Sequence, residues 1–260
     1  MHQAPSHLSA VLERLDRERR SLFPAGVAGQ ALAEVTRLHG LAGDWHQVAF
    51  SALTPGTADR VIAEQVAHYR ELRVGVEWTA YAHDAPEDLL ARLERHGFEI
   101  GPREAVVVLD CQVRPPWLEA PPAHQVEPVR SWRDLRAYAA AAETIFGADQ
   151  TPIVRELEAR LVEGSSDHVA YIAYVGGEAA AVGRLYTHPD SHFAGLYGGG
   201  TLAPYRGRGL YRAVVARRAR DAVRAGARYL RVDALPTSQP ILERLGFEVL
   251  TYVWPCALVE

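Results

Sequence analysis

The sequence contains no lysine, and all 28 of its strongly basic side chains are arginines. A P-loop of the form G-x4-G-K-[ST] needs a lysine, as do the nucleotide site of protein kinases and enzymes that form a Schiff base. The absence of lysine therefore excludes these three classes of site.

Cysteine is almost absent as well, and Cys111 and Cys256 lie in no C-x-x-C or zinc-finger spacing. We interpret both as small buried residues of strands. The motifs H-E-x-x-H and G-x-S-x-G are missing. His188 and His192 flank Pro189, which prevents a helical pair of metal ligands, so we expect no metal site.

Long apolar runs are also missing. No run approaches the roughly 18 residues that a membrane-spanning helix needs, and residues 1–20 are too polar for a secretory signal. The net charge of −4 gives no electrostatic reason to expect nucleic acid. We therefore expect a cytoplasmic protein that binds neither a membrane nor nucleic acid.

What the sequence does contain is a glycine-rich strand that runs into a basic turn and then a helix, at residues 199–211. A helix start exposes unpaired N–H groups and the positive end of the helix dipole. Gly207 and Gly209 permit close approach of a ligand, so the pattern predicts a phosphate or pyrophosphate site. A dinucleotide motif G-x-G-x-x-G is not formed, because Arg212 occupies the third glycine position.

The sequence Arg206-x-x-Gly209 resembles the signature [QR]-x-x-G-x-[GA] of the GNAT superfamily of acyl-CoA-dependent acyltransferases, from which Tyr211 departs. The order of predicted elements from residue 123 onward is similar to that family too. We predict strands at 123–129, 168–175, 179–187, 193–202, 228–234 and 248–258, and helices at 133–146, 152–163, 210–225 and 237–245.

Four prolines lie within residues 114–122 and favour an extended, stiff spacer without a helix. We therefore divide the chain into a domain at 1–114, a linker at 115–122 and a domain at 123–260. Residues 93–100 (LERHGFEI) are repeated at 242–249 (LERLGFEV), with a strand before and after each copy.

The repeat leads us to interpret the first half as a degenerate GNAT-like domain. This half has no RGxG turn and is not expected to bind CoA; its predicted helices are 7–22, 29–39 and 58–72, and its strands 75–81 and 105–110. The expected fold class is α/β, an α+β mixed sheet, with two GNAT-like acyl-CoA acyltransferase domains in tandem.

The resemblance implies that acetyl-CoA is the co-substrate. It assigns the pyrophosphate to the backbone N–H groups of the turn, the oxyanion to a backbone N–H near Leu202, and the pantetheine arm to the neighbouring strand end. The implied cofactor-binding residues are Thr201, Leu202, Ala203, Arg206, Gly207, Arg208, Gly209, Leu210 and Tyr211. The glycines at 198–200 indicate either close approach of a substrate or a bulge or tight packing.

Many members of the family place a general-acid tyrosine where this chain has Leu242, so that role is not carried over. Glu143, Asp233 and Tyr252 are the catalytic candidates by placement, with Tyr186 and Tyr197 as further tyrosines. The expected activity is transfer of an acetyl group from acetyl-CoA to an amine of a small-molecule acceptor by direct attack.

Three alternatives stay open at this stage. One is a CoA-binding regulatory protein with weak or no turnover, and another is a nucleotide-binding α/β domain unrelated to CoA. The third is an acyltransferase that uses a longer acyl chain or a hydroxyl acceptor. Exposed sheet edges also make a homodimer possible.

Overall fold

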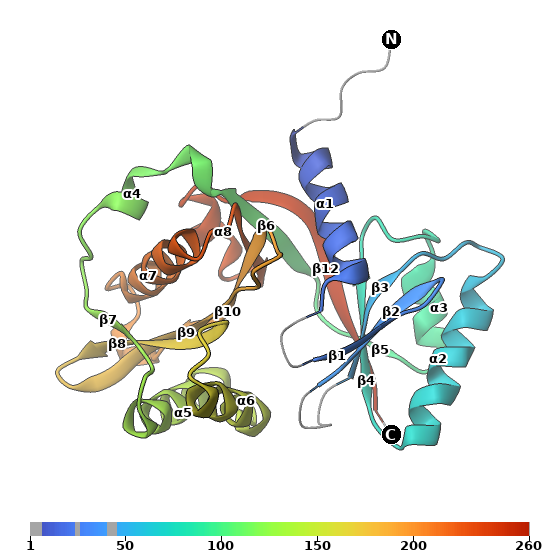
Figure 1. Ribbon diagram of the computed structural model, residues 1–260, viewed down its shortest axis with the longest axis horizontal. Coiled ribbons are helices and arrows are strands. Elements are labelled where there is room, and N and C mark those ends of the chain that lie inside the picture. The colour runs from blue at the N-terminus through green and yellow to red at the C-terminus, as the bar shows by residue number, and fades with distance from the viewer. Residues whose placement is uncertain (1–6, 24–26, 41–45, 260) are drawn as a thin grey trace, which may run out of the picture. The chain divides into compact units, whose positions relative to one another are not determined.

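The computed structural model describes residues 7–23, 27–40 and 46–259. The chain forms two compact units, shown in Figure 1. Unit 1 comprises Met1–Val107, Asp233–Glu243 and Glu248–Glu260, and unit 2 comprises Val108–Val232 and Arg244–Phe247. Each unit is described by itself.

Unit 2 is built on a mixed sheet in the order β11-β10-β9-β8-β7. The strands are β7 (Val126–Pro128), β8 (His168–Val175), β9 (Glu178–Tyr186), β10 (Phe193–Thr201) and β11 (Tyr229–Ala234). Helices α5 (Trp132–Phe146) and α6 (Thr151–Glu163) cover one face and α7 (Leu210–Arg224) covers the other (Figure 1). All neighbours are antiparallel except β10 and β11, which run parallel. The predicted α/β fold with a mixed sheet is confirmed.

Local sequence signals explain these elements. The buried residues of α7 include Leu210, Val214 and Ala222, which recur on one face of the helix. The β8–β9 hairpin turns at Gly176 and Gly177, whose φ angles of 60° and 86° lie in the left-handed region that glycine favours.

Unit 1 has a sheet in the order β1-β2-β3-β4-β12, with β5 also paired to β12. Its strands are β1 (Ala28–Ala31), β2 (Val35–His39), β3 (His46–Ser51), β4 (Val76–Tyr81), β5 (Glu99–Ile100) and β12 (Glu248–Leu258). Its helices are α1 (His7–Ser21), α2 (Ala58–Leu72), α3 (Leu89–Arg95) and α8 (Gln239–Glu243). Trp78 and Phe98 pack edge to face in the core beside α2.

The last strand of the chain is a strand of unit 1. β12 pairs with β4 from Val253↔Tyr81 to Leu258↔Val76 and also with β5. Conversely, β6 (Glu104–Asp110) comes from the N-terminal half, yet its last residues belong to unit 2, where Asp110 forms a 2.7 Å ion pair with Arg228. We call this arrangement the strand exchange.

Two local predictions were wrong. Residues 29–39 form β1 and β2 instead of a helix, and β3 was not foreseen. The proline-rich linker contains one helical turn, α4 (Pro116–Glu119), because proline is tolerated in the first turn of a helix. This turn packs on α7, where Arg220 donates a 2.8 Å hydrogen bond to the carbonyl of Leu118.

The repeated octapeptide has the same local structure in both copies. Gly97 and Gly246 follow a helix with φ angles of 94° and 91°, and Phe98 and Phe247 are buried directly after them. The left-handed glycine ends the helix and turns the phenylalanine into the core in each case.

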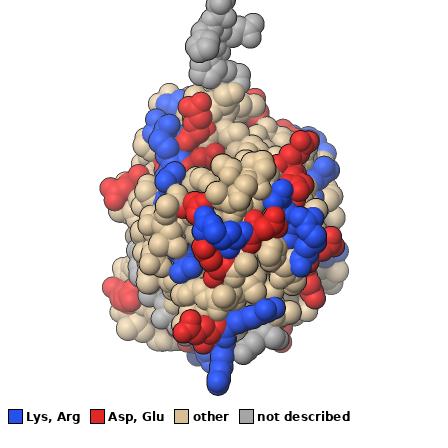
Figure 2. All heavy atoms as spheres, turned by 90° about the vertical axis from the view of Figure 1, so that its right-hand side faces the viewer, with Lys and Arg blue, Asp and Glu red and all other residues tan. Residues whose placement is uncertain are grey.

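The face of unit 1 formed by α2 and α3 carries both signs of charge close together. Figure 2 shows this side of unit 1, with acidic and basic side chains interleaved. Arg92 pairs with Asp59 and Asp88, and Arg60 pairs with Glu64. Among the described helices, none has both the length and the apolarity needed to cross a bilayer.

Candidate functional site

The glycine-rich turn of unit 2 joins β10 to α7, and two of its glycines have left-handed backbone angles. After a 3-10 turn at Ala203–Tyr205, Arg206 is extended, and Gly207 and Gly209 have φ angles of 76° and 81°. These angles suit glycine because a Cβ atom strains the left-handed region. Gly209 is the N-cap residue of α7.

The start of α7 faces open space. A Cβ atom placed on Gly207 would meet nothing within 4 Å, and one on Gly209 would meet only Nε2 of His124, at 3.8 Å. Gly209, the N-cap residue, has no side chain that could cap the first turn of α7. The positive dipole end of the helix therefore faces space in which an anion could lie.

Side chains fix the turn from outside. The Nε of Arg206 donates to the carbonyl of Thr201 at 3.2 Å, and Nε2 of His124 donates to the carbonyl of Arg208 at 2.7 Å. The hydroxyl of Tyr205 donates to the carboxylate of Glu178. The turn is thus held in shape by its own chain before any ligand arrives.

Strands β10 and β11 separate just ahead of the turn. Their parallel ladder consists of Phe193↔Tyr229, Ala194↔Leu230 and Gly195↔Arg231, although both strands continue beyond it. Residues 196–201 of β10 therefore run along an opening in the sheet, which we call the wedge. Backbone N–H groups that face a missing neighbour can serve a ligand.

The three glycines at 198–200 lie in the wedge, and packing explains them. Gly198 has a φ of 51°, and the register with β9 shifts between Tyr197 and Gly200, which marks a bulge. A Cβ on Gly200 would lie 2.4 Å from Cγ2 of Ile145 in α5. The structure favours the bulge and tight packing over the substrate-approach interpretation.

Arg218 is a residue of this region that sequence reasoning missed. It is 1 % exposed, and its Nη1 donates to the carbonyls of Arg184 and Tyr197 at 2.9 and 3.0 Å, which ties α7 to the bulge. Burial lowers the pKa of its guanidinium to about 10. The signal was its spacing, since position 218 lies four residues from both Val214 and Ala222 on the buried face.

The predicted strand-end residues lie at the wedge, with one correction. Thr201 is buried, and its hydroxyl has no hydrogen-bond partner among the described residues. The N–H of Leu202 already donates to the carbonyl of Ala180 at 2.9 Å. It is therefore unavailable to an oxyanion, and the N–H groups of the wedge are the better donors.

The catalytic candidates lie in different units. Glu143 is exposed on α5 in unit 2. Asp233 and Tyr252 belong to unit 1, where the ring of Tyr252 lies 4.5 Å below the guanidinium of Arg103. Leu242 is fully buried in the core. Within the described residues, no group of three or more His, Cys, Asp and Glu side chains is arranged to hold a metal ion.

Comparison with known proteins gives one family and several similar folds. Residues 131–247 match the acetyltransferase (GNAT) family. An uncharacterized N-acetyltransferase of Halalkalibacterium halodurans is 29% identical over 116 residues, which span 41% of this chain and 66% of that relative, just under two thirds of its length.

Solved structures resemble nearly the whole chain. A GCN5-related N-acetyltransferase from Kribbella flavida aligns over 96% of this chain and 93% of its own, with a TM-score of 0.66 and 18% identity. A tandem GNAT protein from the clavulanic acid biosynthesis pathway aligns over 91% of this chain and 84% of its own, with a TM-score of 0.55 and 16% identity. The likeness in fold thus extends over both units.

Proposed function

Because residues 131–247 match the acetyltransferase (GNAT) family and the fold resembles that of a tandem GNAT protein, we propose that the protein transfers an acetyl group from acetyl-CoA to an amine of a small-molecule acceptor. The observation that carries this proposal is the open space at Gly207 and Gly209 in front of α7, whose N-cap residue carries no side chain. A pyrophosphate is the ligand that suits such a helix start.

The residues of the turn would bind the pyrophosphate of acetyl-CoA, and those of β10 would bind its pantetheine arm and thioester. The N–H groups from Gly207 to Tyr211 would hold the pyrophosphate, since the N–H of Arg206 already donates to the carbonyl of Ala203 at 3.3 Å. Thr201, whose buried hydroxyl has no partner among the described residues, would meet the pantetheine arm beside Leu202 and Ala203. Acetyl-CoA supplies an activated thioester, whose carbonyl oxygen the N–H groups of the wedge would stabilise.

The reaction would form an N–C bond and break a C–S bond, while one proton moves from the amine to the leaving sulfur. Glu143 is the candidate in unit 2 for accepting that proton through solvent, since its side chain is exposed. We keep Asp233 and Tyr252 as further candidates.

A second candidate function is CoA binding without turnover. It is favoured by Leu242, which is fully buried and stands where the GNAT resemblance would place a general-acid tyrosine. A protein of this kind would keep the CoA-binding turn and lack acetyl-transfer activity.

The first test is a thermal-shift titration with acetyl-CoA, CoA, ATP and NAD, because a ligand of the native state raises its stability. We expect saturable shifts with the two CoA compounds only. A larger shift with ATP or NAD would overturn the proposal. Thiol release from acetyl-CoA with a panel of amines then separates the two functions, since the binding-only alternative predicts no release.

A further inference from the structure

Arg184 of β9 carries a buried N–H group that the fold leaves unused. Its Nε has no hydrogen-bond partner among the described residues. Arg184 is paired with Tyr197 of β10 in the antiparallel ladder. Its neighbour Gly183 faces α7, since a Cβ there would lie 2.7 Å from Cζ of Arg218. Side chains alternate along a strand, so Arg184 points to the opposite face, toward α5 and α6.

The guanidinium of Arg184 lies beside Gly198, a residue of β10 that borders the wedge. A Cβ atom on Gly198 would be 3.0 Å from Nε and 3.1 Å from Nη2 of Arg184. Gly198 is in the middle of residues 196–201, where β10 has left β11. The absence of a side chain at Gly198 therefore makes room for this cation beside the stretch of β10 that is proposed to bind the thioester carbonyl.

The groups around Arg184 add donors rather than acceptors. The buried hydroxyl of Tyr138 on α5 has no partner among the described residues. Burial raises its pKa, so it keeps its proton, and it is close enough to be influenced by the charges of Arg184 and Arg218. A guanidinium N–H and a tyrosine O–H together suit a carboxylate.

The carboxylate of the chain in this region is already engaged. Glu156 of α6 accepts a 2.9 Å hydrogen bond from Nδ1 of His168. Burial would raise the pKa of Glu156, but the hydrogen bond from His168 and the charges of His168, Arg184 and Arg160 hold it below its usual value. Glu156 thus stays ionised and bound to His168.

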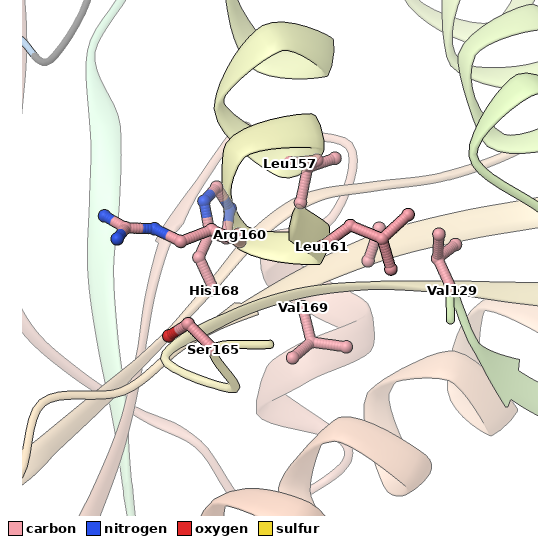
Figure 3. A pocket seen from close by; sticks show the side chains of 8 residues that line it. Val129, Leu157, Arg160, Leu161, Ser165, His168 and Val169 are labelled. Carbon is pink, nitrogen blue, oxygen red and sulfur yellow. The ribbon is translucent and has the colours of Figure 1, made fainter. Parts of the chain in front are cut away.

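A nearby hollow is too small to be the binding site. Figure 3 shows it between α6 and β8, with Leu157, Arg160 and His168 among its lining side chains. Its volume of about 30 Å³ has room for a single water molecule. The rim of the wedge is more open, since Tyr197 and Phe146 are 36% and 38% exposed.

We propose that the acceptor amine also carries a carboxylate, and that Arg184 binds this carboxylate at the wedge. The inference rests on the proposed function and narrows it to amino acids and similar amino-carboxylates. Tyr138 donates a second hydrogen bond, and the rings of Tyr197 and Phe146 flank the carbon skeleton.

The test compares amino acids and longer ω-amino acids with their carboxamides, measuring thiol release from acetyl-CoA by the full chain. We expect at least about tenfold higher kcat/KM for the carboxylates, the size expected for a charge-assisted hydrogen bond. Arg184→Gln should raise KM about tenfold for carboxylates only, leaving the KM for acetyl-CoA unchanged. Arg184→Lys should retain part of the preference, and Arg136→Gln, an exposed arginine of α5, should change nothing.

Equal rates for acids and carboxamides in the wild type would overturn the inference, as would an Arg184→Gln variant that keeps the preference. Failure of thiol release with every amine would instead count against the proposed function. In that case the same pairs are titrated in a thermal-shift assay with CoA present. A shift with carboxylates that Arg184→Gln abolishes supports the inference, and no shift overturns it.

Discussion

Gly209 gives the sharpest residue-scale test of the turn. Its φ of 81° means that valine would strain the backbone as well as fill the space in front of α7. Asparagine tolerates left-handed angles. Gly209→Asn should therefore keep the fold and weaken acetyl-CoA binding at least about tenfold by occupying the ligand's space. Isothermal titration calorimetry measures the loss.

A matched control is available at the end of α6. Gly164 has a φ of 67° and nothing within 4 Å of an added Cβ, whereas an added Cβ on Gly209 would meet only Nε2 of His124, at 3.8 Å. Gly164→Asn should leave acetyl-CoA affinity unchanged. Equal affinity of the two asparagine variants, with both folded, would contradict the assignment of the pyrophosphate to this turn.

A second test at the scale of one residue concerns Glu77 of β4 and the dependence of the protein's stability on pH. Burial raises the pKa of Glu77 above its ordinary value of 4.5, outweighing hydrogen bonds from Gln47 and Thr79. The protonated carboxyl group of Glu77 contributes fully to the free energy of unfolding below pH 4.5. This contribution is lost as the pH rises through the raised pKa of Glu77, because the carboxylate is then buried in its charged form. Glu77→Gln should therefore be more stable than the wild type at pH 7.5, by about 1 kcal/mol, with no difference near pH 4.

Urea unfolding at pH 4, 5.5 and 7.5 measures this difference. Glu94→Gln, at an exposed position of α3, should show no such pH-dependent gain. A Glu77→Gln variant that is less stable than the wild type at pH 7.5 would show that the carboxylate is stabilised where it lies.

At the scale of elements, α5 and β10 are packed without spare room. A Cβ on Gly200 would lie 2.4 Å from Cγ2 of Ile145, so Gly200→Ala should cost about 1–3 kcal/mol. Ile145→Ala removes that methyl group. The double variant should lose less stability than the sum of the two single variants, measured as a double-mutant cycle. Additive losses would mean that α5 does not pack on Gly200 in solution.

The sequence predicted elements best where local signals agree. The helices at 58–72 and 210–225 and the strands at 168–175 and 248–258 were predicted to within one residue, because their apolar period and flanking glycines point the same way. The helix predicted at 29–39 does not form, although alanine, leucine and glutamate in this segment favour a helix. Pairing of β2 with β1 and β3 overrode that preference.

In the candidate site, too, the residues governed by local signals were predicted and those governed by tertiary packing were not. The turn at Gly207 and Gly209 depends on local backbone geometry, and the sequence predicted it. Arg184 and Arg218 depend on which face of β9 and α7 is covered, which tertiary packing decides. Charged side chains usually face solvent, whereas Arg218 is almost completely buried.

At the scale of the whole molecule, the strand exchange makes a testable claim about truncation. A chain that ends at Phe247 lacks β12 and so deprives β4 of a strand-pairing partner. Hydrogen exchange should show lost protection at Val76–Tyr81, while α5 and β8 remain protected. Loss of protection in α5 and β8 with β4 intact would show instead that β12 supports unit 2.

The strand exchange also sets an order of events on the ribosome. Residues of β4 are synthesised before unit 2, and residues of β12 are synthesised after it. At synthesis rates of about 5–20 residues per second, β4 waits roughly ten to thirty seconds for its neighbour. During that time it is an unpaired strand edge, open to wrong pairing. Unit 1 is therefore begun before unit 2 and gains its strand β12 only after unit 2 has been synthesised.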